Sequence, residues 1–398
     1  MPGPATLQAG GGRKERAKVI LCEHGPEGRP AVFGHPDSVI TAEAAEDLPG
    51  AFAAQDAARA RGAWIAGYVA YETGLALEPK LAPVLPPLRD GPLLAMGVYA
   101  GPSDAGPVLE RAAAEAAAVR LTAPQPLLAR SAYDLAMAKV LSYIAAGDCY
   151  QVNLTFPMEA RLENGSALGL YGALRRTGAV GHGALADLGV GPVVVSRSPE
   201  LFFKVDAGGQ IMARPMKGTA PRDPDPQRDA EIAARLSVSE KDRAENLMIV
   251  DLLRNDISRL SEVGSVKVPD LYRMETYSTV HQMTSTIVGQ LRGQPGFGGL
   301  MRALFPCGSV TGAPKIRAMQ IIREVEPAPR GVYCGAVGWM APDGRADFSV
   351  AIRTLSLFPG GRVVMNVGGG VVTDSTADGE WEEALWKARF VKAAVTRR

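Results

Sequence analysis

The sequence predicts an α+β fold, because stretches typical of strands and of helices alternate irregularly rather than in evenly spaced βαβ units. Of the 398 residues, 46% are hydrophobic and 21% are charged, which is the balance of a globular protein with a large buried core. The strand-like stretches are bounded by glycine, and the sequence contains no repeat at the periods of solenoid proteins.

The expected strands are apolar stretches rich in β-branched and aromatic residues. They are residues 64–72, 192–205, 331–341, 348–358 and 362–372. Helical periodicity occurs at 131–146, 239–260, 311–324 and 378–395. Ser239, three residues before Asp242, indicates a capping box at the start of the second helix, and Ser375 or Asp378 is expected to cap the last one.

A low-complexity segment at 109–131 ends in a proline-containing link and suggests a division of the chain. We expect residues 1–18 to be a disordered leader, 19–125 an N-terminal portion and 126–398 a C-terminal portion, the last two able to form one compact body. The first residues lack an apolar signal segment, which favours a cytoplasmic location.

The net charge of +1 gives no sign of a nucleic-acid partner or of an anionic membrane surface, and no apolar run has the length of a membrane-spanning helix. Four cysteines, Cys22, Cys149, Cys307 and Cys334, lie far apart and form no CxxC pair, so neither a zinc site nor thioredoxin-like chemistry is expected. We expect all four to be small apolar residues of the core.

The segment ARPMKGTAPRDPDP, residues 213–226, places Lys217 between Pro215 and Pro221, with Gly218 directly after it. Proline fixes the backbone and glycine permits close approach, so the segment predicts a shaped loop rather than a solvated run of charges. By itself, a single lysine is most often a surface residue that aids solubility.

Two of the expected helices each carry a pair of carboxylates one turn apart. Asp242 and Glu245 lie on one face of the first, and Glu380 and Glu383 have the same spacing in the second. Carboxylates converging from two helices suggest a site for Mg²⁺, which is usually completed by water and substrate oxygens. On spacing alone a commoner arrangement is favoured, in which Glu383 pairs with Lys387 on a wet surface.

Two glycine-rich segments offer backbone N–H groups that can hold an anion. FPCGSVTGAPK, residues 305–315, precedes a helix expected to start near Pro314, and NVGGGVV follows later in the chain. Arg353 and Lys387 could pair with carboxylates. These features suggest a small dicarboxylate substrate bound with magnesium, but glycines that only form tight hairpins explain the same segments about equally well.

From about residue 133 to the C-terminus the sequence resembles the chorismate-utilising enzymes, the family of the large subunits of anthranilate synthase and aminodeoxychorismate synthase and of the isochorismate synthases. The shared motifs are YIAAGDCYQVNL, SRSPELFF, RPMKGTAPR, EKDRAENLMIVDLLRND, FPCGSVTGAPKIRAM, RGVYCGAVGW, AIRTL and GGGVVTDSTADGEWEE. GAWIAGYVAYETG is similar to the N-terminal part of the aminodeoxychorismate branch. The resemblance implies two packed β-sheets flanked by helices.

The resemblance also implies a role for each candidate residue. It implies that Glu245 and Glu383 bind Mg²⁺ with the help of Asp242 and Glu380, and that Glu200 acts in proton transfer. The residues implied to hold the carboxylates of chorismate are Ser309, Thr311, Tyr333, Arg353, Gly368, Gly370 and Lys387.

The residues at two positions indicate which branch of the family the chain resembles. Isochorismate and salicylate synthases carry a lysine base where this chain has Gln151, and anthranilate synthases carry alanine where it has Lys217. The P-x-K-G-T form is that of the aminodeoxychorismate synthases, in which the lysine attacks C2 of chorismate and ammonia then attacks C4. Such a lysine must lose its proton, and we expect burial or a neighbouring cation such as Arg214 to favour the uncharged amine.

Other features leave alternatives open. The register around His281 and Gln282 is ambiguous, so either position could face the departing hydroxyl. The segment around His182 differs from the family's usual NP-x-PY, so we expect the substrate pocket to differ there. The chain has no Gly-x-Cys-x-Gly elbow, which implies that a separate glutamine amidotransferase subunit supplies ammonia. Anthranilate synthase component I and a non-catalytic chorismate-binding subunit remain the alternative functions.

Overall fold

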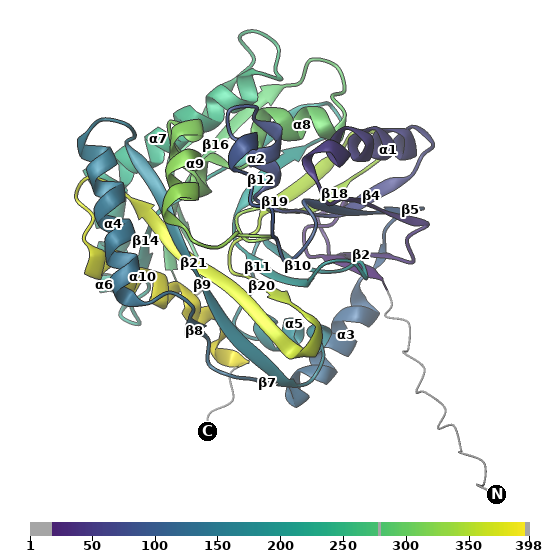
Figure 1. The fold of residues 1–398 in the computed structure, drawn as a ribbon, viewed down its shortest axis with the longest axis horizontal. Helices are drawn as coiled ribbons and strands as arrows, with labels where there is room; N and C mark the ends of the chain where they lie inside the picture. The colour runs from purple at the N-terminus through teal and green to yellow at the C-terminus, as the bar shows by residue number, and fades with distance from the viewer. Residues whose placement is uncertain (1–17, 278–279, 395–398) are drawn as a thin grey trace, which may run out of the picture.

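The computed structural model describes residues 18–277 and 280–394, and it contains two large antiparallel sheets that pack face to face (Figure 1). The expected leader, 1–18, lies outside the described residues apart from Lys18. The predicted α+β class and the two packed sheets are confirmed.

The first sheet has eleven strands in the order β17-β9-β21-β20-β11-β10-β1-β2-β6, with β7 and β8 also paired to β9. Their bounds are β1 Val19–Cys22, β2 Ala31–Gly34, β6 Ser103–Asp104, β7 Arg120–Leu121, β8 Gln125–Pro126, β9 Gln151–Asn164, β10 His182–Asp187, β11 Val193–Ser198, β17 Gly312–Ala313, β20 Thr354–Leu357 and β21 Arg362–Val371. The long strands β9 and β21 run side by side over most of their lengths (Figure 1).

The second sheet has ten strands in the order β14-β16-β13-β12-β19-β18-β4-β5-β3, with β15 paired to β16. Their bounds are β3 Ser38–Ala42, β4 Trp64–Val69, β5 Leu94–Tyr99, β12 Leu201–Val205, β13 Gln210–Arg214, β14 Met216–Pro221, β15 Lys267–Thr276, β16 Val280–Gln290, β18 Ala336–Met340 and β19 Ala346–Val350. Strands from residues 19–125 therefore occur in both sheets, beside strands from the rest of the chain.

Helices cover the outer faces of the two sheets. Their bounds are α1 Leu48–Ala60, α2 Thr73–Leu77, α3 Gly106–Glu115, α4 Arg130–Ala145, α5 Ala167–Arg175, α6 Pro226–Val238, α7 Glu240–Ser258, α8 Phe297–Leu304, α9 Lys315–Val325 and α10 Ala377–Lys387. One apolar cluster joins α1, α7 and α8 to the ten-stranded sheet, and another joins α4, α5, α9 and α10 to the eleven-stranded sheet. A third lies between the sheets, with Ile20 and Val194 from one and Tyr68 and Trp339 from the other.

Two of the expected strands are each divided between the sheets, which corrects the predicted elements. Residues 192–205 form β11 in one sheet and β12 in the other, and residues 348–358 form β19 and β20. Pro199 cannot donate a ladder hydrogen bond, and Arg353 has a positive φ of 49°, so neither position continues a regular strand. Both breaks lie where the chain passes from one sheet to the other.

The predicted helices are found, with corrections at their ends. Ser239 caps α7, since its Oγ accepts a hydrogen bond from the N–H of Asp242. Thr376, rather than Ser375 or Asp378, caps α10. The helix predicted from residue 311 begins at Lys315, because Gly312 and Ala313 pair with β9 as the short strand β17.

All four cysteines are buried and unpaired, as expected for apolar core residues. Among the described residues, the helices are all too short or too polar to cross a membrane.

Candidate functional site

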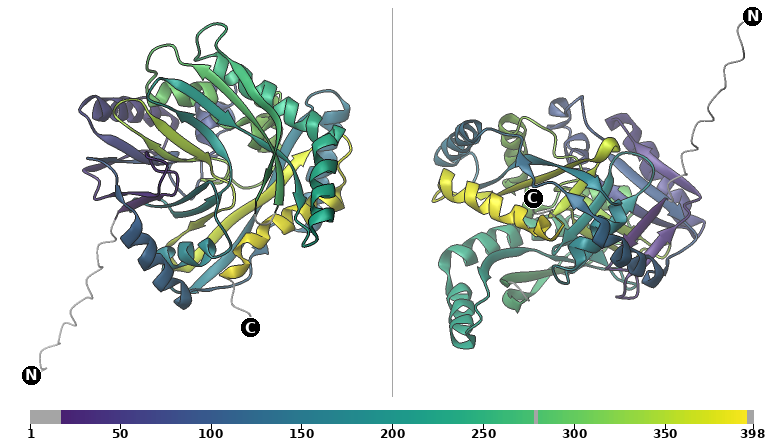
Figure 2. Two further views of the ribbon diagram at one scale, coloured as in Figure 1. Left: turned by 180° about the vertical axis from the view of Figure 1, so that it is seen from behind. Right: turned by 90° about the horizontal axis from the view of Figure 1, so that it is seen from below.

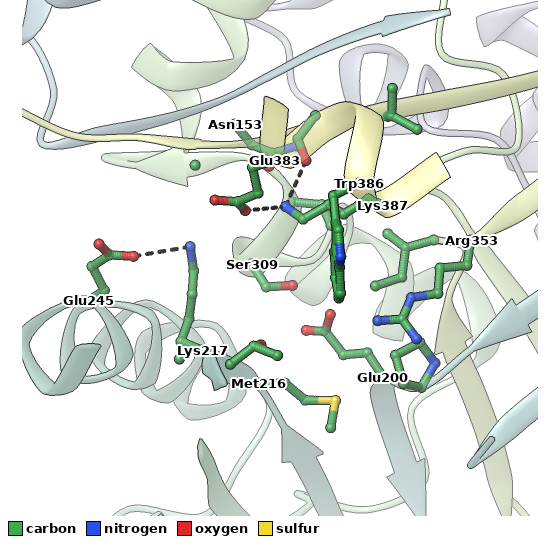
Figure 3. Close-up of a pocket in the computed structure, with 18 of the residues that line it drawn as sticks. Asn153, Glu200, Met216, Lys217, Glu245, Ser309, Arg353, Glu383, Trp386 and Lys387 are labelled. Atoms are coloured by element: carbon green, nitrogen blue, oxygen red, sulfur yellow. Dashed lines mark hydrogen bonds and ion pairs between the residues drawn. The ribbon is translucent and has the colours of Figure 1, made fainter. Parts of the chain in front are cut away.

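A cavity of about 690 Å³ lies between the edges of the two sheets, and residues of α7 and α10 form part of its wall (Figure 3). Both views in Figure 2 place these two helices on the same side of the molecule. Strands β14 and β16 contribute from one sheet and β9 and β21 from the other. The predicted site residues that line the cavity are Glu200, Lys217, Asp242, Glu245, Ser309, Tyr333, Arg353, Gly368, Gly370, Glu380, Glu383 and Lys387. Thr311 does not line it, because its hydroxyl is buried and donates to the carbonyls of Cys307 and Gly308.

Lys217 enters the cavity from a β-bulge rather than from a loop. The register between β14 and β16 shifts between Met216 and Thr219, so Lys217 and Gly218 together lie opposite one residue, Met283. Gly218 has a positive φ of 85°, which glycine adopts without strain. A bulge bends the strand and redirects a side chain, which explains how an edge strand points this lysine inward.

The neighbours of Lys217 differ from the expected ones. Its Nζ lies 3.6 Å from Glu245 Oε2 and 3.4 Å from Gln151 Oε1, and its side chain is 16% exposed (Figure 3). Arg214, the cation expected beside it, pairs instead with Glu275 on β15. The lysine is therefore largely buried, as expected, but a carboxylate rather than an arginine is its charged contact.

Gly370 leaves the space that the lysine uses. A Cβ atom at this position would lie 2.9 Å from Lys217 Nζ and 3.0 Å from Gln151 Nε2. Any larger residue would displace the amine, so this glycine is required for close approach rather than for a hairpin.

Glu200 lies at the first crossover between the sheets and is only 4% exposed. Burial raises the pKa of its carboxyl to about 7, although the Ser309 hydroxyl and the positive charge of Lys217 oppose the increase. Its Oε1 has no hydrogen-bond partner among the described residues. A carboxyl with such a pKa can hold or release a proton near neutral pH.

The two acidic pairs face the same cavity, as the helical spacing predicted. Glu383 Oε1 lies 2.7 Å from Lys387 Nζ, so the expected i, i+4 pair exists, but on the cavity wall rather than on an outer surface. Burial alone would raise the pKa of Glu383. The charge and hydrogen bond of Lys387, together with the charges of nearby lysines, have the larger effect, so the pKa is lowered. Burial and the charge of Glu383 together raise the pKa of Glu380, against a hydrogen bond from Ser375.

The carboxylates of the cavity are candidate ligands of a divalent cation. Within the described ranges, no three His, Cys, Asp or Glu side chains are grouped closely enough to hold a metal ion by themselves. The backbone does leave room beside the α10 pair, since a Cβ atom on Gly369 would lie 2.7 Å from Glu380 Oε2 and 3.5 Å from Glu383 Oε1. One or two carboxylates completed by water and substrate oxygens suit Mg²⁺, so the donor set fits that ion.

Arg353 lies where the chain passes from β19 to β20, which is the second crossover between the sheets. Its guanidinium forms no ion pair with the described residues, and burial lowers its pKa. Ser309 and Tyr333 line the same cavity as Arg353. A buried cation without a counter-charge is costly, so this part of the cavity is suited to an anionic ligand.

The structure resolves the ambiguous register in β16. Gln282 faces the cavity, where it accepts a hydrogen bond from Thr219 and donates one to the Gly218 carbonyl. His281 points elsewhere and contacts Asp229 Oδ1 at 2.8 Å. Because an amide is not an acid, Gln282 cannot donate a proton to a bound ligand as a carboxyl such as Glu200 can.

His182, where a difference in the pocket was expected, does not line this cavity. Its ring lies 4.9 Å from that of His24 and its Nε2 is 3.6 Å from Asp347 Oδ1. Sequence reasoning missed Asn153 and Asn366, which line the cavity from β9 and β21. Each is a polar residue within an otherwise apolar strand. Such a residue indicates a position on a cavity wall only once the place of its strand in the sheet is known.

The family model described as "chorismate binding enzyme" matches residues 17–393 of this chain. The chain belongs to that family. Aminodeoxychorismate synthase component 1 of Escherichia coli strain K12 is 44% identical over 267 residues, which is 67% of this chain and 58% of the relative. Anthranilate synthase component 1 of Streptomyces coelicolor is 41% identical over 265 residues, 66% of this chain and 50% of the relative. The matches thus span little more than half of these relatives.

Solved structures of the same fold cover nearly the whole chain. Anthranilate synthase component I of Streptococcus pneumoniae aligns with a TM-score of 0.75 at 24% identity, over 98% of this chain and 95% of that one. The menaquinone-specific isochorismate synthase of Escherichia coli aligns with a TM-score of 0.73 at 18% identity, over 95% and 89%. The predicted chorismate-binding fold is therefore confirmed.

The raised pKa of Glu200 predicts a pH-dependent gain in stability for Glu200→Gln. Below pH 4.5 this carboxyl is protonated in both states, and between 4.5 and about 7 only the unfolded chain loses the proton. The wild type should therefore lose stability relative to the variant over that window, by about 3 kcal/mol in total, with a constant difference at higher pH. Urea denaturation from pH 4 to 8 measures it.

The exposed Glu110 provides the matched control. Glu110→Gln should shift stability by less than about 0.5 kcal/mol at every pH. A difference between wild type and Glu200→Gln that stays flat from pH 4 to 8 would show that Glu200 titrates normally.

Proposed function

We propose that this chain converts chorismate and ammonia to 4-amino-4-deoxychorismate with Mg²⁺, as an aminodeoxychorismate synthase component I acting in the synthesis of 4-aminobenzoate and folate. The observation that carries the proposal is Lys217, whose amine projects into the same cavity as the buried acid Glu200 (Figure 3). The similarity to the Escherichia coli relative of that name supports it.

Chorismate is a dianion, and the cavity offers complementary groups at two places. In the proposal Arg353 and Tyr333 hold one carboxylate, and Ser309 and the backbone amides of Gly368 and Gly370 contribute hydrogen bonds. Lys387 is fixed beside them by the Gly368 carbonyl at 2.8 Å. Thr311 supports this wall from behind through its backbone, since its N–H donates to the Gly308 carbonyl and its carbonyl accepts from Asn153.

In the proposal the metal lies between α7 and α10, beside Lys217 and Lys387. Glu245 and Glu383 would hold Mg²⁺, with Asp242 and Glu380 assisting directly or through water. When bound, the ion would draw electron density from the ring carboxylate of chorismate and so ease nucleophilic attack on the ring. It would also take Glu245 away from Lys217, whose amine must be uncharged to act as a nucleophile.

The proposed chemistry divides one difficult displacement into two. The Lys217 amine attacks C2, the ring double bonds shift, and the C4 hydroxyl leaves as water with a proton from Glu200. Ammonia then attacks C4, the double bonds shift back, and the lysine leaves C2. The proton that the lysine amine loses in the first step restores the Glu200 carboxyl, and the proton that ammonia loses in the second step goes to the departing lysine amine. The net reaction therefore exchanges hydroxyl for amine and releases water.

Anthranilate synthesis is the second candidate, because the Streptomyces coelicolor relative is nearly as similar. In that reaction ammonia itself would attack C2 of chorismate, the atom that Lys217 attacks in the proposed amination. Purified protein incubated with chorismate, ammonium and magnesium separates the two by product mass and fluorescence, and chelation should abolish turnover until magnesium is restored. Anthranilate as the product would replace the proposal, and absence of turnover at high ammonium would leave a non-catalytic chorismate-binding subunit.

A covalent adduct on Lys217 is expected when chorismate and magnesium are supplied without ammonia. The peptide containing residues 213–222 should gain the mass of chorismate minus water, because the first step can occur alone. Lys217→Ala should lose the adduct and slow amination on the order of 10²-fold, equivalent to ~2.7 kcal/mol of barrier. Intact and peptide mass spectrometry after acid quench measures the adduct.

Lys217→Arg tests whether positive charge is sufficient. Guanidinium stays protonated, so this variant should be as inactive as Lys217→Ala. If the arginine variant is active and Lys217 stays unmodified during turnover, Lys217 is not a nucleophile. It then acts only as a positive charge that stabilises the bound substrate.

We also propose that a separate glutamine amidotransferase subunit supplies ammonia. The isolated chain should use ammonium but not glutamine, and glutamine should support turnover once a class I amidotransferase subunit is added. Isotope transfer from amide-labelled glutamine to the product measures this directly. Glutamine-dependent amination by the chain alone would refute it.

A further inference from the structure

The bulge that turns Lys217 into the cavity lies in a strand with little support from its own sheet. Among the strands that the structure describes, β14 pairs with β16 alone. A bulge interrupts the ladder of backbone hydrogen bonds and bends the strand that contains it. The position of Lys217 therefore depends on the side chains that contact the bulge.

The side chain of Gln282 binds both residues that follow Lys217. Its Nε2 donates a hydrogen bond to the Gly218 carbonyl at 2.8 Å, and its Oε1 accepts one from the Thr219 hydroxyl at 2.9 Å. Gln282 is only 8% exposed, so water competes little for these two bonds. One amide thus joins the bulge to the facing strand at the point where the regular ladder is interrupted.

The neighbouring residue of β16 serves a different part of the structure. Successive side chains of a strand point to opposite faces of the sheet. His281 contacts Asp229 of α6 at 2.8 Å, whereas Gln282 faces the cavity. Gln282 rather than His281 is therefore the residue of β16 whose side chain holds the bulge.

The first turn of α7 also packs against the bulge. A Cβ atom on Gly218 would lie 3.1 Å from the Cβ atom of Asp242. The bulge thus lies against the helix that carries Asp242 and Glu245, two of the candidate metal ligands. A shift of the bulge would move the Lys217 amine in relation to both.

The lysine amine has little room for such a shift. Its Nζ lies 3.6 Å from Glu245 Oε2, and a Cβ atom on Gly370 would lie only 2.9 Å from it. Misplacing a reacting group by about 1 Å can lower a rate on the order of 10²-fold. A residue that fixes the bulge can therefore control the reactivity of Lys217 without contacting the substrate.

We infer that Gln282 is a positioning residue for Lys217, and that its amide holds the Gly218–Thr219 backbone so that the amine keeps its place in the cavity. The inference rests on the proposed nucleophilic role of Lys217. The position requires a donor for a carbonyl and an acceptor for a hydroxyl at the same time, and a neutral amide supplies both. No proton transfer by Gln282 is needed.

Gln282→Leu tests the inference, because it removes both hydrogen bonds with little change in size. The kcat for amination should fall about 10–100-fold, with KM for chorismate within about threefold of wild type, since the groups that bind the substrate are unchanged. Formation of the Lys217 adduct without ammonia should slow by the same factor. Quenched-flow kinetics followed by peptide mass spectrometry measures that step.

Gln290 provides a matched control on the same strand. Its Nε2 donates to the Gly208 carbonyl at 2.8 Å, and it does not line the cavity. Gln290→Leu removes the same kind of bond at the other end of β16, and it should leave kcat and KM within about twofold of wild type.

Gln282→Glu distinguishes a missing donor from a general disturbance of the fold. An ionised carboxylate can accept from the Thr219 hydroxyl but cannot donate to the Gly218 carbonyl, whereas a protonated carboxyl can do both. The activity of Gln282→Glu relative to wild type at the same pH should therefore rise as the pH falls. The corresponding ratio for Gln282→Leu should not change with pH.

Chemical labelling of the free protein tests the position of the amine without turnover. Acetic anhydride should modify Lys217 several-fold faster, relative to the other lysines, in Gln282→Leu than in wild type or Gln290→Leu. Peptide mass spectrometry of residues 213–222, in which Lys217 is the only lysine, measures the rate.

Unchanged kcat together with unchanged labelling in Gln282→Leu would overturn the inference, as would an equally large loss of kcat in Gln290→Leu. A wild type that yields no aminated product would instead refute the proposed function. The labelling rates would then still decide whether Gln282 positions the amine.

Discussion

The site depends on two places where the chain passes from one sheet to the other. The crossovers at Ser198–Leu201 and Val350–Thr354 hold each other through hydrogen bonds from Arg197 N to Arg353 O at 3.0 Å and from Val350 N to Glu200 O at 3.1 Å. Ser198 Oγ adds a third bond to the Val350 carbonyl at 2.6 Å. Because these groups are buried, their hydrogen bonds are costly to break, and Glu200 and Arg353 are fixed in relation to both sheets.

Two ion pairs lie on the cavity wall, and a bound metal ion or anionic substrate would replace one member of each pair. Glu245 contacts Lys217 and Glu383 contacts Lys387, so each carboxylate and each amine has an opposite charge nearby. A magnesium ion would replace the lysines as the partner of the carboxylates, and an anionic substrate would replace the carboxylates as partner of the lysines. These two pairs therefore cost little free energy to hold before a ligand binds, whereas the Arg353 guanidinium forms no ion pair with the part of the chain that the structure describes.

Close backbone approach lets α10 and the bulged strand β14 meet at β21. Gly369 lies against the acidic pair of α10, and Gly370 lies against Lys217. Asn366 and Gly368 line the same cavity from this strand. One strand therefore contacts the acidic pair of α10 through one glycine and Lys217 through the next, which explains why consecutive glycines occur within it.

The sequence by itself determined the fold class, four of the helices and most of the cavity residues, because those depend on local periodicity, on glycine and on long motifs shared with a known family. The i, i+3 spacing of Asp242 and Glu245, for example, places both on one face of α7 in any tertiary context. Only the tertiary structure decided what depends on contacts between distant segments. In the structure Glu245 rather than Arg214 contacts Lys217, and Gln282 rather than His281 faces the cavity. Thr311 does not line the cavity, because its hydroxyl bonds to backbone carbonyls. The crossovers at Pro199 and Arg353 could not be predicted, since an apolar run looks the same whether it stays in one sheet or passes between two.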